Sequence, residues 1–242
     1  MKKILVPSLI AAAIASLTSV AHAAEPESTL GFNAGAVTEY RYRGISQSRL
    51  QPAVQGGVDY ADKSGFYVGA WGSSIKWIKD AGGDAPVEID LYGGYKGAVG
   101  DVAYDVGFLR YEYPSNKLAV SANTNEVYGA VTYGLFTAKY SHAVSNLFGF
   151  GDSKNSYYLD LSAALDLGDG YTLTPHVGRQ SVKNNTAYSY NDYALTLGKD
   201  LGNGLSASAA VIGTNADKAL YITPEGKFTG KTGVVVGLKY SF

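Results

Sequence analysis

Acid–base chemistry in this chain would have to use His142 or His176, the two histidines beyond its apolar first segment. A serine nucleophile needs a histidine within hydrogen-bond reach and a third group that orients the ring. Ser141 and His142 are neighbours in an extended stretch, so their side chains point to opposite faces. Asp160 or Ser162, across from His176, remains open as a partner. We favour a solvated or hydrogen-bonded histidine and expect no enzymatic activity.

Other reactive groups are scarce. The chain has no cysteine, its two later histidines are far apart, and no loop has the oxygen-rich spacing of a calcium site. The formal net charge is −1, without a run of like charges, whereas a nucleic-acid-binding surface needs a clear basic face. We therefore expect no metal site, no cofactor and no nucleic-acid partner.

The charged residues alternate with apolar ones. Between residues 87 and 96, Val87, Ile89 and Leu91 alternate with Glu88 and Asp90. A repeat of two is the period of a strand whose two faces meet different surroundings. Segments of this kind are near the roughly 9–11 residues that a tilted membrane strand needs. We predict about twelve strands, at 31–43, 52–61, 65–75, 86–96, 101–113, 125–133, 135–142, 156–167, 170–181, 190–200, 204–214 and 232–242.

The lengths of the connections distinguish a soluble β-sandwich from a membrane barrel. Long links such as KDAGGDAP and AVSNLFGFGDSKN alternate with short ones such as GAVG, GDG and GNG. Bacterial outer-membrane barrels have long loops at one end and short turns at the other, whereas Greek-key crossings give no such regularity. The pattern predicts an all-β protein, a transmembrane antiparallel up-and-down β-barrel. An even number of strands places both termini in the periplasm.

The first residues predict export. Lys2 and Lys3 precede an apolar run, and Ala21-His22-Ala23 has the small-residue spacing of a cleavage site. The alternative is a membrane anchor, but the run contains proline and several hydroxyl residues and ends in small ones. We expect a signal peptide at 1–23, cleavage between Ala23 and Ala24, and one barrel domain at 24–242.

The last residues are apolar at every second position. Val236, Leu238, Tyr240 and Phe242 alternate with Gly237, Lys239 and Ser241, and the chain ends on the aromatic. This ending resembles the sorting signal of bacterial outer-membrane proteins, which is recognised by the barrel assembly machinery. The last strand must pair with the first, because a lipid-exposed barrel can have no open edge.

Four longer stretches carry a narrower resemblance. GFLRYEYP at 107–114, NEVYGAV at 125–131, SYYLDLSAALDLGDGYTLTPHVGRQ at 156–180 and YNDYALTLGKDLG at 190–202 resemble, in this order, the TorF-type family of porins in Gram-negative bacteria. The resemblance covers most of the chain after the signal peptide. It implies a barrel in the bacterial outer membrane with outer-membrane lipid around it, and a pore without a named solute.

The charges on the polar face then become candidates for lining a pore. In segment 31–43 we expect Glu39, Arg41 and Arg43 on the inner face of one strand. Facing acidic and basic rows in a watery lumen would select small polar solutes, which predicts passive diffusion of hydrophilic molecules. Alternatively, the charges pair and plug the barrel, which then acts as a structural, adhesive or receptor surface through its long loops. We interpret tyrosines at strand ends as membrane-interface residues, in preference to sugar-stacking ones. The pore-lining candidates are Glu39, Arg41, Arg43, Glu88, Asp90, Asp105, Glu126, Lys139, Asp160, His176 and Lys239.

Overall fold

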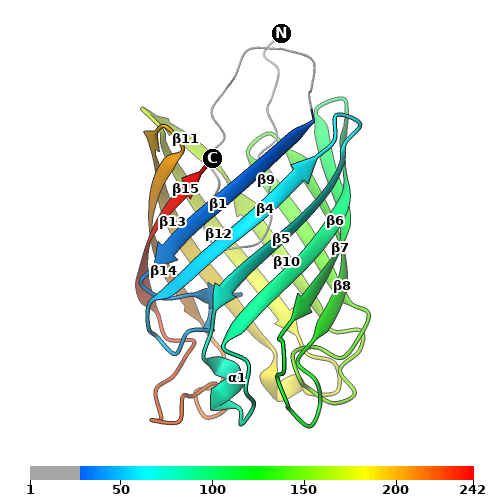
Figure 1. The fold of residues 1–242 in the computed structure, drawn as a ribbon, viewed down its shortest axis with the longest axis vertical. Helices are drawn as coiled ribbons and strands as arrows, with labels where there is room; N and C mark the ends of the chain where they lie inside the picture. Colours follow the sequence, from blue (N-terminus) through cyan, green and yellow to red (C-terminus); the bar gives the residue numbers. More distant parts are fainter. Residues whose placement is uncertain (1–27) are drawn as a thin grey trace.

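A computed structural model describes residues 28–242, and the predicted signal peptide 1–23 with its cleavage between Ala23 and Ala24 lies outside them. The described chain forms an antiparallel β-barrel (Figure 1). No helix in residues 28–242 is long and apolar enough to cross a membrane. The barrel strands are β1 (Thr29–Val37), β4 (Ala53–Ala61), β5 (Phe66–Ser74), β6 (Val87–Val99), β7 (Val102–Glu112), β8 (Thr124–Tyr133), β9 (Phe136–Ala143), β10 (Tyr157–Ala163), β11 (Leu165–Gly168), β12 (Tyr171–Ser181), β13 (Tyr190–Gly202), β14 (Leu205–Thr214) and β15 (Gly233–Ser241).

Each barrel strand pairs with its neighbours along the chain. β10 and β11 both pair with β12 and occupy one position, so the thirteen strands fill twelve positions. The predicted strand number and antiparallel order are therefore confirmed. A separate two-stranded hairpin is formed by β2 (Arg41–Tyr42) and β3 (Ile45–Ser46). The loops also contain α1 (Trp77–Asp80) and the short 3₁₀ helix η1 (Thr186–Tyr188).

The last strand closes the barrel against the first. β15 pairs with β1 from Asn33 opposite Ser241 to Val37 opposite Gly237. The pairing continues past the last assigned strand residue, since the Phe242 amide donates to the Phe32 carbonyl at 3.0 Å and the Phe32 amide donates back at 2.8 Å. The two phenylalanine rings stack with centroids 5.8 Å apart. The terminal aromatic is thus part of the closing seam.

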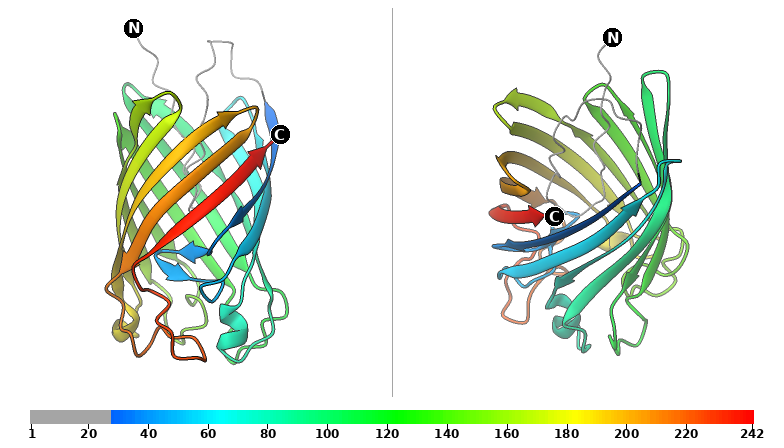
Figure 2. Two further views of the ribbon diagram at one scale, coloured as in Figure 1. Left: turned by 90° about the vertical axis from the view of Figure 1, so that its left-hand side faces the viewer. Right: turned by 45° about the horizontal axis from the view of Figure 1, so that its top comes forward.

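The two ends of the barrel differ as the link lengths predict. Five short turns lie at one end, which we call the short-turn end, together with the start of β1 and the C-terminus (Figures 1 and 2). Asp169-Gly170 and Asn203-Gly204 form two of these turns with positive φ at both residues, the geometry of a tight hairpin. The six longer connections, including α1, gather at the opposite long-loop end.

The barrel wall has an apolar outer face. Leu91, Leu161 and Val211 are exposed, whereas Asp90 and Ile212 beside them are buried. Exposed aromatic rings also gather towards the short-turn end, the arrangement of an interfacial girdle. These are Phe32, Tyr60, Phe66, Tyr133, Phe136, Tyr171, Tyr240 and Phe242. Other tyrosines near strand ends, namely Tyr111, Tyr113 and Tyr190, are buried inside the barrel, so the girdle interpretation is wrong for them.

The first predicted strand is too long. β1 ends at Val37, and residues 38–52 leave the wall. Glu39 therefore lies in a connecting turn, Arg41 lies in β2, and Arg43 has a positive φ in the turn between β2 and β3. The alternation of residue types continues through Tyr40 and Tyr42, but Glu39, Tyr40 and Arg41 are all buried, so it does not mark a wall strand with two unlike faces.

Candidate functional site

The hairpin of residues 38–52 crosses the lumen near the long-loop end (Figure 2). It starts from β1, and the side chain of Arg43 reaches Glu126 on β8 and Gln180 on β12. β8 is five positions from β1 around a ring of twelve, so these contacts lie on almost the opposite wall. The hairpin thus divides a mouth on the long-loop side from the rest of the lumen.

Arg43 anchors the tip of the hairpin. Its guanidinium lies 2.7 Å from Glu126 and donates to Gln180 Oε1 at 2.7 Å. The arginine and glutamate side chains are only 5% and 1% exposed. Burial alone would lower the pKa of Arg43, but the Glu126 carboxylate raises it well above its ordinary value, so the arginine stays charged. Its guanidinium carbon also stands 4.4 Å above the ring of Tyr158, a cation–π distance.

A second arginine holds the base of the hairpin. Arg41 Nε lies 2.9 Å from Glu39 Oε1, so this ion pair is internal to the hairpin segment. Arg41 Nη1 donates to the backbone carbonyl of Lys231 at 2.6 Å, just before β15. The two arginines therefore fasten one hairpin to different places, Arg43 to β8 and β12 and Arg41 to the segment before β15.

Two tyrosines of the hairpin, Tyr40 and Tyr42, also contact the barrel wall through their hydroxyls. Tyr40 and Tyr113 donate to the two carboxylate oxygens of Glu88 at 2.6 and 2.8 Å. Burial, with the negative charges of Glu88 and Asp90, raises the pKa of both hydroxyls well above the ordinary value. The hydroxyls therefore remain donors. Tyr42 makes a further hydroxyl contact with Tyr111 on β7.

On the short-turn side of the hairpin, the inner wall is polar and partly accessible to solvent. Lys96 Nζ and Asp105 Oδ2 are 4.0 Å apart, with side chains 28% and 15% exposed. His176 Nε2 lies 3.0 Å from Asp160 Oδ2, and these side chains are 19% and 25% exposed. All four belong to barrel strands. Each lies on the same strand face as buried residues at every second position, so its accessible surface faces the lumen.

His176 has the partner that the sequence left open, but no nucleophile. Besides Asp160, its Nε2 contacts the Tyr158 hydroxyl at 3.1 Å, and its Nδ1 is 3.6 Å from Asp192 Oδ1. Ser162 is the cross-strand neighbour of His176, yet no hydrogen bond joins their side chains in the described part of the chain. The ring is held by acceptors and a phenol, an arrangement that suits a pore wall better than acyl transfer.

Glycines let the inward tyrosines lie along the wall. Tyr92 on β6 faces Gly69 on β5, and a Cβ at Gly69 would overlap its ring. Tyr128 lies across Gly107 in the same way. The Tyr92 hydroxyl donates to Asp59 at 2.6 Å, which fixes the ring in this position. Aromatic rings that lie flat occupy less of the lumen than rings that project into it.

The predicted pore residues fall into two groups. Glu39, Arg41 and Arg43 belong to the hairpin, and Glu88 and Glu126 are the wall carboxylates that contact it. The remaining candidates lie on barrel strands, namely Asp90, Asp105, Lys139, Asp160, His176 and Lys239. Charge and alternation did not predict the inward tyrosines as site residues or Gln180 as an anchor. The phase of each strand could have indicated them, since Tyr92 and Tyr158 alternate in step with the acidic residues.

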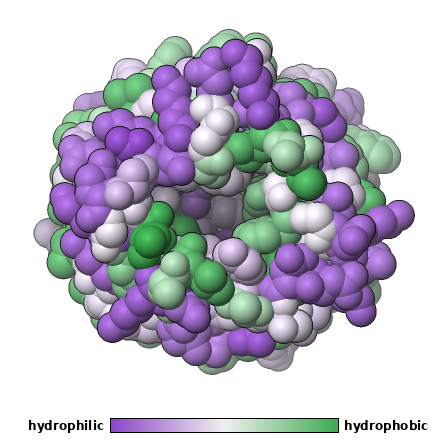
Figure 3. Space-filling view, turned by 90° about the horizontal axis from the view of Figure 1, so that it is seen from below, coloured by the Kyte–Doolittle hydropathy of each residue, from purple (hydrophilic) through white to green (hydrophobic). Residues whose placement is uncertain are grey.

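A cavity of about 570 Å³ opens on the long-loop side of the hairpin. Figure 3 shows this end of the molecule, with hydrophobic residues around a central hollow and hydrophilic residues on the outer rim. We call this cavity the vestibule. Its lining comes from the hairpin and five loop regions and includes Tyr42, Arg43, Ile45, Gln47, Trp77, Asp80, Tyr113, Leu118, Val120, Leu147, Phe148, Phe150, Gln180, Val182, Tyr188, Tyr190, Leu220, Tyr221 and Ile222.

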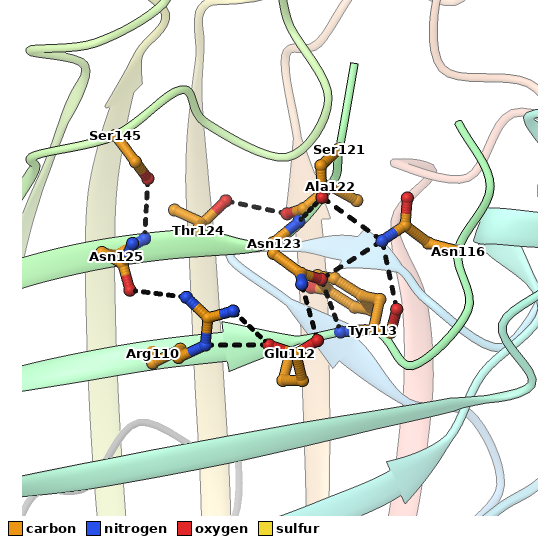
Figure 4. A network of polar contacts seen from close by, with 10 residues as sticks. All are labelled: Arg110, Glu112, Tyr113, Asn116, Ser121, Ala122, Asn123, Thr124, Asn125 and Ser145. Carbon is orange, nitrogen blue, oxygen red and sulfur yellow. Dashed lines mark hydrogen bonds and ion pairs between the residues drawn. The ribbon is translucent and has the colours of Figure 1, made fainter. Parts of the chain in front are cut away.

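The outer wall becomes polar where β7 and β8 approach the long loops (Figure 4). Arg110 pairs with Glu112 and donates to Asn125 Oδ1 at 3.2 Å. The Asn123 side chain donates to Glu112 Oε1 at 2.6 Å. These residues alternate with the inward Tyr111 and lie past the exposed Phe108. The network therefore marks the edge of the apolar belt at this end.

The closed twelve-position barrel, apolar outside and polar within, has the architecture of outer-membrane porins. The chain belongs to the family described as "Bacterial protein of unknown function (Gcw_chp)", which matches residues 21–242. No curated protein matches the chain.

Solved barrels share this architecture at low sequence identity. A KdgM porin is 10% identical, with a TM-score of 0.58 over 88% of this chain and 99% of its own. A NanC porin is 11% identical, with a TM-score of 0.53 over 88% and 99% of the two chains. The COG4313 outer membrane channel from Pseudomonas putida F1 is 12% identical, with a TM-score of 0.50 over 90% and 96%. At such identities the likeness shows the fold.

Proposed function

We propose that this protein is a narrow outer-membrane channel for the passive diffusion of small hydrophilic solutes. The observation that carries the proposal is the partly accessible charge on the inner wall, at Lys96, Asp105, Asp160 and His176. Charged groups inside an apolar belt are costly unless they are paired or meet water. Their accessible surface is therefore best explained by a water-containing lumen on the short-turn side of the hairpin.

In this proposal the hairpin is the constriction. A solute enters the vestibule, passes the hairpin held by Arg43 and Glu126, and leaves along the polar wall. The accessible acidic and basic groups of that wall, Lys96, Asp105 and Asp160, favour solutes that can exchange water for hydrogen bonds with both. No covalent chemistry is required, and the protein acts as a channel rather than an enzyme.

The orientation follows from the general pattern of bacterial barrels. Long loops of such barrels are extracellular and short turns are periplasmic. We place the long-loop end outside the cell and both termini in the periplasm. The barrel assembly machinery would recognise β15 through Val236, Leu238, Tyr240 and Phe242. Export through the signal peptide and membership of the TorF-type porins belong to the same proposal.

A second function deserves a test because the hairpin is so well anchored. The ion pair between Arg43 and Glu126 is almost fully buried. If the hairpin never leaves its place, the barrel is occluded, and its long loops would serve as a receptor or adhesive surface. This alternative predicts a folded protein that passes no solute.

Liposome swelling separates the two functions. Vesicles that contain the refolded protein would be placed in isotonic arabinose, glucose, sucrose or raffinose, with protein-free vesicles as the control. A narrow channel should give fast swelling with arabinose and progressively slower swelling with the larger sugars. An absence of swelling with every sugar, from protein shown to be folded, would contradict the channel and favour the occluded barrel.

A further inference from the structure

The vestibule has a lining that a passage for hydrophilic solutes does not require. Its walls present Trp77, Leu118, Val120, Phe148, Tyr188 and Ile222 from five loops. Its volume of about 570 Å³ falls within the range of about 300–1,000 Å³ that is typical of small-molecule sites. Binding of a ligand that displaces water from apolar side chains is favourable, because it removes apolar surface from water.

The charges of the vestibule are already neutralised within the protein. Arg43 is paired with Glu126 and is 5% exposed. Asp80 is paired with Arg49, and Arg49 also approaches Glu225 at 3.7 Å. A charged ligand would have to compete with these pairs, whereas an uncharged ligand would leave them intact. The balance of charge therefore points to a neutral occupant.

We propose that the vestibule is a binding site for small uncharged molecules with an aromatic ring. Phe148 and Trp77 supply ring surfaces on different loops, and the aliphatic side chains of Leu118 and Ile222 add further apolar contacts. The site lies on the long-loop side of the hairpin, so binding needs no passage through the lumen. This inference goes beyond the proposed channel, and either one can fail without the other.

Tryptophan fluorescence gives a direct test. The chain has only two tryptophans, Trp71 and Trp77, so Trp71→Phe leaves Trp77 in the vestibule as the reporter. The probe would be 4-bromobenzyl alcohol, a neutral aromatic molecule whose bromine quenches indole emission. 4-Bromobenzoate would serve as the charged comparison. We expect saturable quenching by the alcohol and at least about tenfold weaker binding of the benzoate, the factor that corresponds to 1.4 kcal/mol.

Matched variants place the binding site. Ile222→Gln lies in the lining and is 47% exposed in the free protein, so folding should tolerate the change. Val144→Gln alters a similarly exposed residue, 38%, at the same end but outside the lining. In the Trp71→Phe background, Ile222→Gln should weaken binding about tenfold through lost apolar contact, and Val144→Gln should not. Unsaturable quenching, equal binding by the two variants, or equal binding of alcohol and benzoate would overturn the proposal.

Discussion

At the scale of single residues, successive side chains of each barrel strand point alternately to the outer face and to the lumen. Leu161 is 45% exposed on the outer face, whereas Ser162 is the cross-strand neighbour of His176 and Thr137 on the inner one. Sequence alternation predicted this phase without any structure. It did not predict which inward charges meet, because contacts across a barrel depend on the register of strands far apart in the chain.

The phase assignment has a measurable consequence at these two positions. Leu161→Arg would place a charge in the apolar belt and should lower the free energy of unfolding by roughly 2–4 kcal/mol near the bilayer midplane. Ser162→Arg should cost less, because its side chain points into the lumen. Folding titrations in lipid would measure both, and a larger loss for Ser162→Arg would show that the phase is wrong.

A carboxylate in the turn between β4 and β5 should titrate unusually low. The Ser64 hydroxyl and amide and the Ser28 hydroxyl donate to Asp62 and lower its pKa to about 2. Because this pKa is depressed, the associated stability is present above the unfolded value near 4 and is lost as pH falls towards 2. NMR titration should show the low pKa in the wild type and a rise in Ser64→Ala. An ordinary pKa in the wild type would contradict these hydrogen bonds.

At the scale of elements, the barrel strands were predictable and the hairpin was not. Glu88 and Asp90 lie on the predicted face of β6, because a wall strand has one lipid face and one polar face throughout. Arg41 and Arg43 continue the same alternation after β1 has ended. Their place in the lumen depends on partners such as Glu126 and Lys231, which lie 83 and 190 residues further along the chain. Local periodicity carries no information about such contacts.

The glycines under the inward tyrosines should control the width of the lumen. Gly69→Val would occupy the space beneath the Tyr92 ring, and the ring should then project into the lumen. Single-channel conductance should fall relative to the wild type. Gly129→Val is the control, since a Cβ there meets no atom within 4 Å. Equal conductance for the two variants would show that Tyr92 does not limit the path.

The closing seam should depend on the last residue. Phe242 exchanges two backbone hydrogen bonds with Phe32 and stacks on its ring. Deletion of Phe242 should therefore hinder assembly far more than deletion of Ala219, a residue of the loop before β15. Heat-modifiability on gels and outer-membrane yield would report assembly. Similar yields for the two deletions would contradict a role for the terminal aromatic.

At the scale of the whole molecule, the protein is a barrel with a polar inner wall, a crossing hairpin and an apolar vestibule. Link lengths and alternation predicted the closed barrel and its two unlike ends. The vestibule was not predictable, since Trp77, Phe148 and Ile222 come from loops that have no shared pattern and meet only after the barrel has closed. The central claim is that the hairpin limits diffusion through the lumen.

Single-channel conductance in planar bilayers tests this claim most directly. Replacing Arg41 and Arg43 with serine removes both arginine anchors of the hairpin and leaves Glu126 buried without its ion-pair partner, at a cost of roughly 3–5 kcal/mol if the hairpin stays in place. The hairpin should therefore leave the wall. Conductance should rise severalfold and selectivity should shift towards cations, less so at high salt, where exposed charges are screened over about 3 Å at 1 M.

The matched control replaces Arg110 and Arg179 with serine. These two arginines lie on the outer face, so the same change of charge leaves the hairpin untouched. We predict a small, stable wild-type conductance, an unchanged control and a larger, more cation-selective current in the Arg41→Ser/Arg43→Ser variant. A silent wild type with a conducting variant would show an occluded barrel instead, and equal currents in all three proteins would contradict a constriction at the hairpin.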